Sequence, residues 1–166
     1  NLQRQILYHD ADIGKAKVDV AQQAATKLNP NIVINKINQR LTAQHFFEDA
    51  AAFFAPIDVI IDGSDNYQTR LLVSDLSVKY QVPLVSAAIG QFQGQLATFR
   101  GWEADKPCYR CFVGDAHDPD DCDDCSEQGV LGAMVGLIGT FAAMEAIRVI
   151  TGFGDDPAGK LQLFDG

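Results

Sequence analysis

The first residues of the chain carry groups that can bind phosphate. Arg4 offers a planar fork of donors for phosphate oxygens, and Lys17 supplies a mobile point charge. Asn1 adds an amide that can bond oxygen atoms or a metal-bound water. Such groups serve phosphoryl or nucleotidyl transfer, so phosphate chemistry is the first hypothesis.

A second polar cluster, Asp62-Gly63-Ser64-Asp65-Asn66, follows the apolar run 57–62. In an open parallel sheet, ligands bind beyond the carboxyl ends of the strands, which is where this cluster would lie. Asp65 could hold Mg²⁺ against a triphosphate, because Mg²⁺ favours one or two carboxylates together with phosphate oxygens. On position alone, however, helix capping by Asp65 or Asn66 is the better explanation, since both residue types are favoured caps.

Four cysteines form two CxxC pairs, Cys108 with Cys111 and Cys122 with Cys125. Four thiolates at this spacing indicate a structural zinc site of the ribbon type. Because no export signal is present, metal or redox chemistry in a reducing cytosol is expected, and we predict a cytoplasmic protein.

Hydrophobic periodicity predicts one α/β domain, in which a largely parallel sheet is flanked by helices. The chain has 166 residues and is 47% hydrophobic, which suffices for one core. Helices are expected at 14–28, 42–54, 67–80 and 129–151. Strands are expected at 31–37, 57–62, 83–87, 92–99 and 160–165, with a cysteine- and aspartate-rich loop at 101–128.

The net charge of -9 argues against nucleic acid and anionic membranes as partners, since both would need a basic face. The most apolar stretch, 130–150, is interrupted by Glu145 and Arg148 and contains several glycines. We therefore expect a buried helix there and no membrane span.

Three motifs together resemble the ubiquitin-activating (E1)-like adenylating enzymes of the MoeB, ThiF and HesA type. They are NLQRQ at residues 1–5 with a later GxxK, DGSDN at 62–66 with Arg70, and PCYRC at 107–111 with the segment CSEQGVLG at 125–132. They cover nearly the whole chain in the family's order. The resemblance implies a Rossmann-like fold.

Carried across residue by residue, the resemblance assigns Asp65 to magnesium and Lys17 to the catalytic lysine. Arg4 is implied in catalysis and, with Asn1 and Gln5, in contacts to the nucleotide phosphates. Asn66 and Arg70 match signature positions; of these, Asn66 is placed with the nucleotide-binding residues, and no firm role follows for Arg70.

The resemblance also changes the zinc assignment. Cys108 and Cys111 match only half of the family's zinc site, whose other half lies beyond the strand resembling 161–166. Cys125 matches a loop cysteine that in several members takes part in thioester, persulfide or disulfide chemistry. Two interpretations of Cys122 and Cys125 stay open: a zinc pair, or a loop with one reactive thiol, which we favour.

The implied reaction joins AMP from ATP to the C-terminal glycine carboxylate of a small ubiquitin-like sulfur-carrier protein ending in Gly-Gly, as in molybdopterin or thiamine biosynthesis, and releases pyrophosphate. ATP, Mg²⁺ and Zn²⁺ are the implied cofactors, and a homodimer is expected. Residues 87–91 and 93–95 resemble the stretch beside which the carrier's tail is threaded, although Gly94 is equally explained by a bulge.

The resemblance further implies a partial adenylation domain at 1–166, without the family's N-terminal βαβ portion and its C-terminal zinc half-site, so we expect little activity from this chain alone. Two other functions remain in view: an NAD-binding module of an oxidoreductase, against which no GxGxxG follows a strand, and a zinc-stabilised interaction domain.

Overall fold

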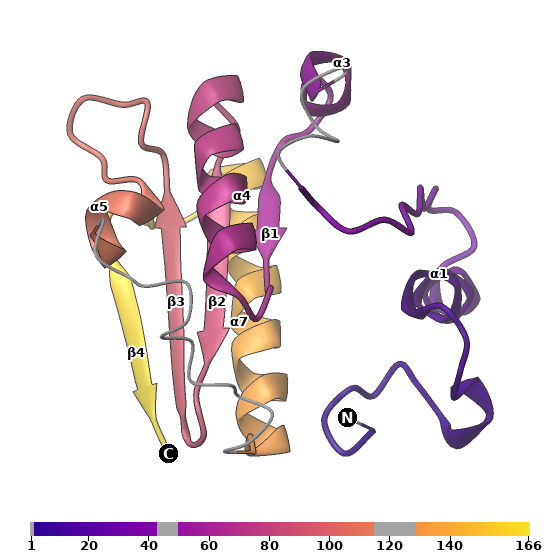
Figure 1. Cartoon of the computed structure of the whole chain (residues 1–166). Coiled ribbons are helices and arrows are strands. Elements are labelled where there is room, and N and C mark those ends of the chain that lie inside the picture. The colour runs from indigo at the N-terminus through magenta and orange to yellow at the C-terminus, as the bar shows by residue number, and fades with distance from the viewer. Residues whose placement is uncertain (1, 43–49, 115–128) are drawn as a thin grey trace. The chain divides into compact units, whose positions relative to one another are not determined.

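The computed structural model describes residues 2–42, 50–114 and 129–166 (Figure 1). The chain forms two compact units, Asn1–Arg40 and Leu41–Gly166, and each is described by itself. The first contains the 3-10 helix η1 (Asp10–Asp12) and the helix α1 (Lys17–Leu28). The second contains helices α3 (Ala50–Phe54), α4 (Tyr67–Tyr80), α5 (Tyr109–Val113) and α7 (Gly132–Thr151), and strands β1 (Ile60–Asp62), β2 (Leu84–Ile89), β3 (Gln93–Phe99) and β4 (Leu161–Asp165).

In the first unit, α1 confirms the expected amphipathic helix, but the strand predicted at 31–37 does not form. That segment is fastened to α1 by two contacts instead. Gln22 donates to the carbonyl of Ile34 at 2.8 Å, and Lys36 pairs with Asp19 at 2.5 Å. An alternating segment becomes a strand only beside another strand, and the described residues of this unit contain none.

The sheet of the second unit has the order β1-β2-β3-β4. β1 and β2 run parallel, with Asp62 opposite Ser86, whereas the β2–β3 and β3–β4 pairs are antiparallel. The predicted α/β class with flanking helices is confirmed, and the described sheet is mixed. Only three residues join β2 to β3, which is long enough for a hairpin and too short for the crossover that a parallel pair needs.

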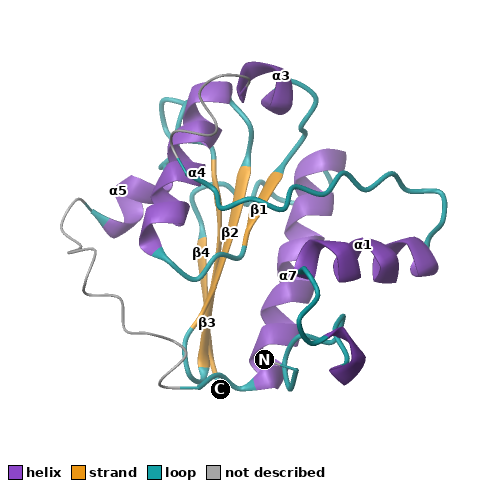
Figure 2. Cartoon of the chain, turned by 45° about the vertical axis from the view of Figure 1, so that its right-hand side comes forward, coloured by secondary structure: helices purple, strands orange, loops and turns teal. Residues whose placement is uncertain are grey.

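Helices cover both faces of this sheet: α4 and α5 lie on one face and α7 on the other (Figure 1, Figure 2). The alternation along β2 serves both layers, because successive side chains point to opposite faces. Leu84 packs with Phe99 and Tyr109 on the α4 and α5 face, and Val85 packs with Leu96 on the α7 face.

The predicted helix Tyr67–Tyr80 is confirmed as α4, and capping explains its ends. Asn66 is the N-cap, and its side chain accepts a hydrogen bond from the amide of Thr69 at 2.9 Å. At the other end Gln81 adopts the left-handed conformation (φ 55°), which turns the chain toward β2.

Gly94 on β3 allows α7 to lie close to the sheet. A Cβ at this position would stand 2.4 Å from Cγ1 and 2.5 Å from Cδ1 of Ile138, whose side chain is fully buried. Gly94 is paired within the regular β2–β3 and β3–β4 registers, so it fills a packing position and not a bulge.

Among the described residues, α7 is the one helix long and apolar enough to cross a bilayer by length and composition. One of its faces packs on the sheet through Met134, Ile138 and Ala142, in keeping with the predicted core helix. The opposite face leaves large apolar side chains exposed, including Leu137, Met144 and Ile147.

Two expected features lie partly outside the described residues. Of the helix expected at 42–54, the structure describes Thr42 and the helical residues Ala50–Phe54. Of the loop 101–128, residues 101–114 are described and include the short helix α5. Cys122, Cys125 and Asn1 lie outside the described residues.

Candidate active site

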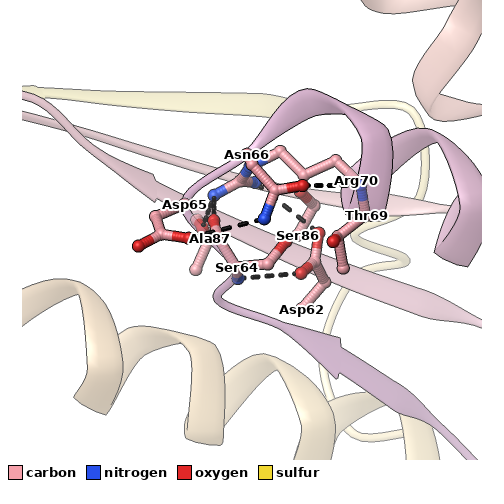
Figure 3. A network of polar contacts seen from close by, with 8 residues as sticks. All are labelled: Asp62, Ser64, Asp65, Asn66, Thr69, Arg70, Ser86 and Ala87. Carbon is pink, nitrogen blue, oxygen red and sulfur yellow. Dashed lines mark hydrogen bonds and ion pairs between the residues drawn. The ribbon is translucent and has the colours of Figure 1, made fainter. Parts of the chain in front are cut away.

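The turn between β1 and α4, residues Asp62 to Asn66, is held at both ends by side-chain hydrogen bonds (Figure 3). At its start the Asp62 carboxylate accepts from the amide of Ser64 at 2.9 Å. At its end the Asn66 side chain accepts from the amide of Thr69. The turn therefore has a defined shape at the carboxyl end of β1, as the strand-end motif predicted.

Arg70 crosses from the first turn of α4 to this end of the sheet and is only 8% exposed. Its Nη1 lies 3.2 Å from Ser86 Oγ and 3.7 Å from Asp62 Oδ2. Its Nη2 donates to the carbonyls of Ser64 and of Ala87, the latter at 2.8 Å. The Arg70 guanidinium thus binds acceptors of the protein itself. Its position fits a residue that connects the turn to the sheet better than one that contacts a phosphate.

Asp65 differs from its neighbours because its side chain is exposed. Its closest polar contact among the described residues is a long one, 3.5 Å from Asn66 Nδ2 to Oδ1 (Figure 3). A carboxylate so placed keeps its lone pairs available for a cation, and carboxylate oxygen is a ligand that Mg²⁺ prefers. The residues present therefore fit the magnesium role implied for Asp65, while Asn66 acts here as the helix cap.

The phosphate-binding candidates of the first unit are Arg4, Gln5 and Lys17. Lys17 is the exposed first residue of α1, and no ion pair involves it among the described residues. Lys15, its near neighbour, instead pairs with Asp12 at 2.9 Å. This difference favours Lys17 over Lys15 as a ligand-binding cation. The structure brings Asp65 and Asn66 together in the second unit, whereas their association with the first-unit residues stays a prediction.

The cysteine pair at the start of α5, where Cys108 is the N-cap, has the geometry of half a metal site. Cys108 Sγ and Cys111 Sγ are 3.4 Å apart, close to the roughly 3.8 Å that two thiolates would span on a tetrahedral zinc ion. Hydrogen bonds from the backbone and the thiol of Cys108 lower the pKa of Cys111, which favours the thiolate that a metal requires. No third candidate ligand joins them among the described residues, so the pair fits half of a zinc site and no more.

Packing and ion pairs fix the position of this cysteine pair. Gly101 lies against Cys108, where a Cβ would come within 2.4 Å of the cysteine Cβ. Arg110 donates two hydrogen bonds to Asp75 of α4, at 2.7 and 2.8 Å. Tyr109, the first residue of α5, packs against Leu84 and Phe99 of the sheet, and burial raises the pKa of its hydroxyl.

Sequence reasoning missed Ser86, the carbonyl of Ala87, Gly101 and Tyr109. Ser86 and Ala87 lie within reach of Arg70 because Asp62 pairs with Ser86 in the parallel register of β1 and β2. Strand register is a property of the folded sheet and has no motif in the sequence. For Gly101 the only available signal was its residue type, seven residues before a cysteine.

Comparison with known proteins places the chain in a family. A family model described as the ThiF family matches residues 1–166. The chain is 39% identical over 168 residues to the sulfur carrier protein adenylyltransferase of Thermus thermophilus, covering 99% of the chain and 60% of that protein. It is 41% identical over 167 residues to the sulfur carrier protein ThiS adenylyltransferase of Escherichia coli, covering 100% and 63%. For the molybdopterin-synthase adenylyltransferase of Escherichia coli the identity is 36% over 167 residues, covering 99% and 64%.

Solved structures share the fold at lower identity. MccB of Escherichia coli superposes with a TM-score of 0.72 at 16% identity, covering 99% of this chain and 51% of that one. Its complex with ATP gives the same TM-score. The chain spans about two thirds or less of the curated relatives named above, between 60% and 64% of their length. Since the family model matches from the first residue to the last, the chain belongs to the ThiF family.

Proposed function

We propose that the protein containing this chain uses ATP to adenylate the C-terminal glycine carboxylate of a small ubiquitin-like sulfur-carrier protein and releases pyrophosphate. The observation that carries the proposal is the exposed Asp65 carboxylate on the fixed turn at the end of β1. The relatives described above, which are named as adenylyltransferases of sulfur carriers or of molybdopterin synthase, support the same reaction class.

In this reaction one oxygen of the carrier's carboxylate attacks the α-phosphorus of ATP. The new bond is carboxylate to phosphorus, the bond that breaks joins the α-phosphorus to the bridging oxygen, and pyrophosphate leaves with that electron pair. Two anions must approach each other, so neutralisation of charge is the main requirement and no protein nucleophile is needed.

Asp65 would hold the Mg²⁺ that accompanies ATP and screens this charge. Lys17, Arg4, Gln5 and Asn1 would bind the phosphates as cations and hydrogen-bond donors. Asn66 contributes by fixing the turn through its cap on α4.

Cys108 and Cys111 would supply two of the four thiolates of a structural Zn²⁺ site, as their sulfur separation allows. We keep Cys125 as a candidate thiol for chemistry with the activated carrier, outside the described residues. A cytoplasmic homodimer also stays part of the proposal. The exposed apolar face of α7 is a surface of the kind that such pairing would cover.

The pathway follows from the carrier, and the curated relatives include proteins named for ThiS and for molybdopterin synthase. We favour the molybdopterin branch. Pull-down with candidate carriers ending in Gly-Gly would identify the partner.

The reaction is tested by exchange of radioactive pyrophosphate into ATP, measured on the full-length protein that carries this chain. We expect exchange only when the correct carrier is present. Asp65→Ala should lower the rate by about 10² to 10³-fold, the usual loss when one group that stabilises developing charge is removed. Asp58→Ala is the matched control, because Asp58 is also exposed but precedes β1 at its opposite end. Exchange by Asp65→Ala at the wild-type rate would show that the magnesium role is misassigned.

A further inference from the structure

Asp65 is placed by its neighbours, since its own contacts are weak. Among the described residues its side chain makes one long contact, with Asn66, whereas the residues on both sides are held firmly. The carbonyl of Ser64 belongs to the peptide bond that leads into Asp65, and it accepts from Arg70. The following residue, Asn66, is fixed by its bond to Thr69. The exposed carboxylate therefore projects from a backbone that is clamped before and after it (Figure 3).

Arg70 joins this clamp to the neighbouring strand. One nitrogen, Nη2, is shared between the Ser64 carbonyl in the turn and the Ala87 carbonyl on β2. The other, Nη1, faces Ser86 Oγ and the buried Asp62 carboxylate. A planar guanidinium can donate hydrogen bonds to acceptors in several directions at once. A lysine ammonium, which is a compact point charge, cannot reach all of these acceptors. Arg70 thereby fixes the position of the turn relative to the parallel strands β1 and β2.

We propose that Arg70 is a positioning residue, which holds the Ser64–Asp65 peptide so that the Asp65 carboxylate meets the metal–ATP complex in one orientation. This inference rests on the proposed function, because it gives Asp65 the metal. Arg70 itself would not touch the phosphates, since it is buried and three of its hydrogen bonds go to acceptors of the protein. If Arg70 only stabilised the fold, its replacement would lower the stability of the protein and leave the dependence of the reaction on Mg²⁺ unchanged.

Pyrophosphate exchange by the full-length protein, measured as a function of Mg²⁺, distinguishes these roles. In Arg70→Met we expect the half-saturating Mg²⁺ concentration to rise by about tenfold, which corresponds to about 1.4 kcal/mol. At saturating Mg²⁺ the KM for ATP should change by less than about threefold, because binding contacts to the phosphates are intact. Arg70→Lys should recover part of the shift, since the charge returns but the two-carbonyl clamp does not.

Leu76→Ala is the matched control for stability. Leu76 is buried on the same helix, α4, and packs with Phe54 and Val82, away from the turn. This variant should be less stable and keep the wild-type dependence on Mg²⁺. An equal shift in Leu76→Ala and Arg70→Met, or no shift in either Arg70 variant, would overturn the positioning role. If Arg70→Met does not fold, Arg70→Lys decides by the same criterion.

A binding measurement separates failure of this inference from failure of the proposed reaction. Binding of Mn²⁺ in the presence of ATP, followed by electron paramagnetic resonance, requires no carrier and no turnover. Weaker Mn²⁺ binding in Arg70→Lys than in wild type supports the inference even when no tested carrier gives exchange. Equal Mn²⁺ binding in the two proteins overturns it, whereas absent exchange in wild type with every carrier counts against the reaction alone.

Discussion

Replacing Gly94 by alanine tests the close contact between α7 and the sheet. The added Cβ would stand 2.4 and 2.5 Å from two carbons of Ile138 and 3.2 Å from Met134 Sδ. Met134 can yield because its chain is flexible, but Ile138 is fully buried and the Gly94 backbone is paired on both sides. Overpacking of this kind costs about 1–3 kcal/mol.

Two effects set the expected net value. Exchanging glycine for alanine also restricts the unfolded chain, which stabilises a protein by about 0.4–1 kcal/mol where the backbone conformation is compatible. We therefore expect Gly94→Ala to lower the free energy of unfolding by about 1–2 kcal/mol. Urea titration of the chain, followed by the fluorescence of its single tryptophan, Trp102, in the second unit, would measure this change.

The control is the same substitution at Gly136. This glycine lies on α7, and a Cβ there would meet nothing within 4 Å among the described residues. Gly136→Ala should raise stability by about 0.5–1 kcal/mol through helix propensity. Combining Gly94→Ala with Ile138→Ala should cost less than the sum of the single changes, by at least about 0.5 kcal/mol, because the clashing atoms are gone.

An unfolding midpoint of Gly94→Ala at or above the wild-type value would refute the packing argument. The variant also addresses the alternative that Gly94 makes room for the carrier's tail. In that case stability would be unchanged, while carrier-dependent exchange would fall.

Two further predictions concern charge. The Asp156 carboxylate accepts a hydrogen bond from the amide of Ala158 and pairs with Lys106, and these contacts lower its pKa. The contribution of Asp156 to stability is therefore present above the ordinary carboxyl pKa. It is lost as the pH falls through the lowered pKa of the folded state. Asp156→Asn should lower the free energy of unfolding by less than about 1 kcal/mol at neutral pH, as expected for an exposed ion pair. Urea titrations of the variant and of wild type should give the same free energy of unfolding at about pH 2. A difference in free energy that stays constant with pH would contradict this linkage. In metal-free protein, the lowered pKa of Cys111 should place the midpoint of its alkylation rate by iodoacetamide below the usual value of about 8.5. Cys108→Ala should raise that midpoint only in part, because the backbone hydrogen bond from residue 108, the larger cause, remains. An unchanged profile would show that the Cys108 thiol does not contribute.

Elements that carry their own boundary signals were predictable from the sequence. The bounds of α4 follow from the Asn66 cap and from Pro83 soon after its last residue, and the structure agrees at both ends. The predicted strand at 31–37 failed, although its alternation was as regular as that of 92–99. Periodicity describes a face, whereas a strand also needs a hydrogen-bonded neighbour, which β3 has on both sides and 31–37 lacks among the described residues. For the same reason periodicity could not give the directions of β3 and β4.

The pattern D-x-x-D-N-x-x-x-R shows both what a motif reveals and what it leaves open. It falls on the turn between β1 and α4, and its two aspartates have opposite environments. Asp62 is the inward-facing last residue of β1, only 5% exposed, and is balanced by Arg70. Asp65 lies three residues later, beyond the strand, and is exposed.

The arginine of this motif is ambiguous in the same way, because a guanidinium suits a phosphate as well as protein carbonyls. In the structure the arginine bonds to acceptors that come from β2, sixteen and seventeen residues later in the chain. Strand register brings them within reach, and it is set by the packing of the whole sheet. The motif therefore predicts where the turn lies. The difference between Asp65, whose side chain is exposed, and Arg70, whose side chain bonds to acceptors of the protein, depends on tertiary structure.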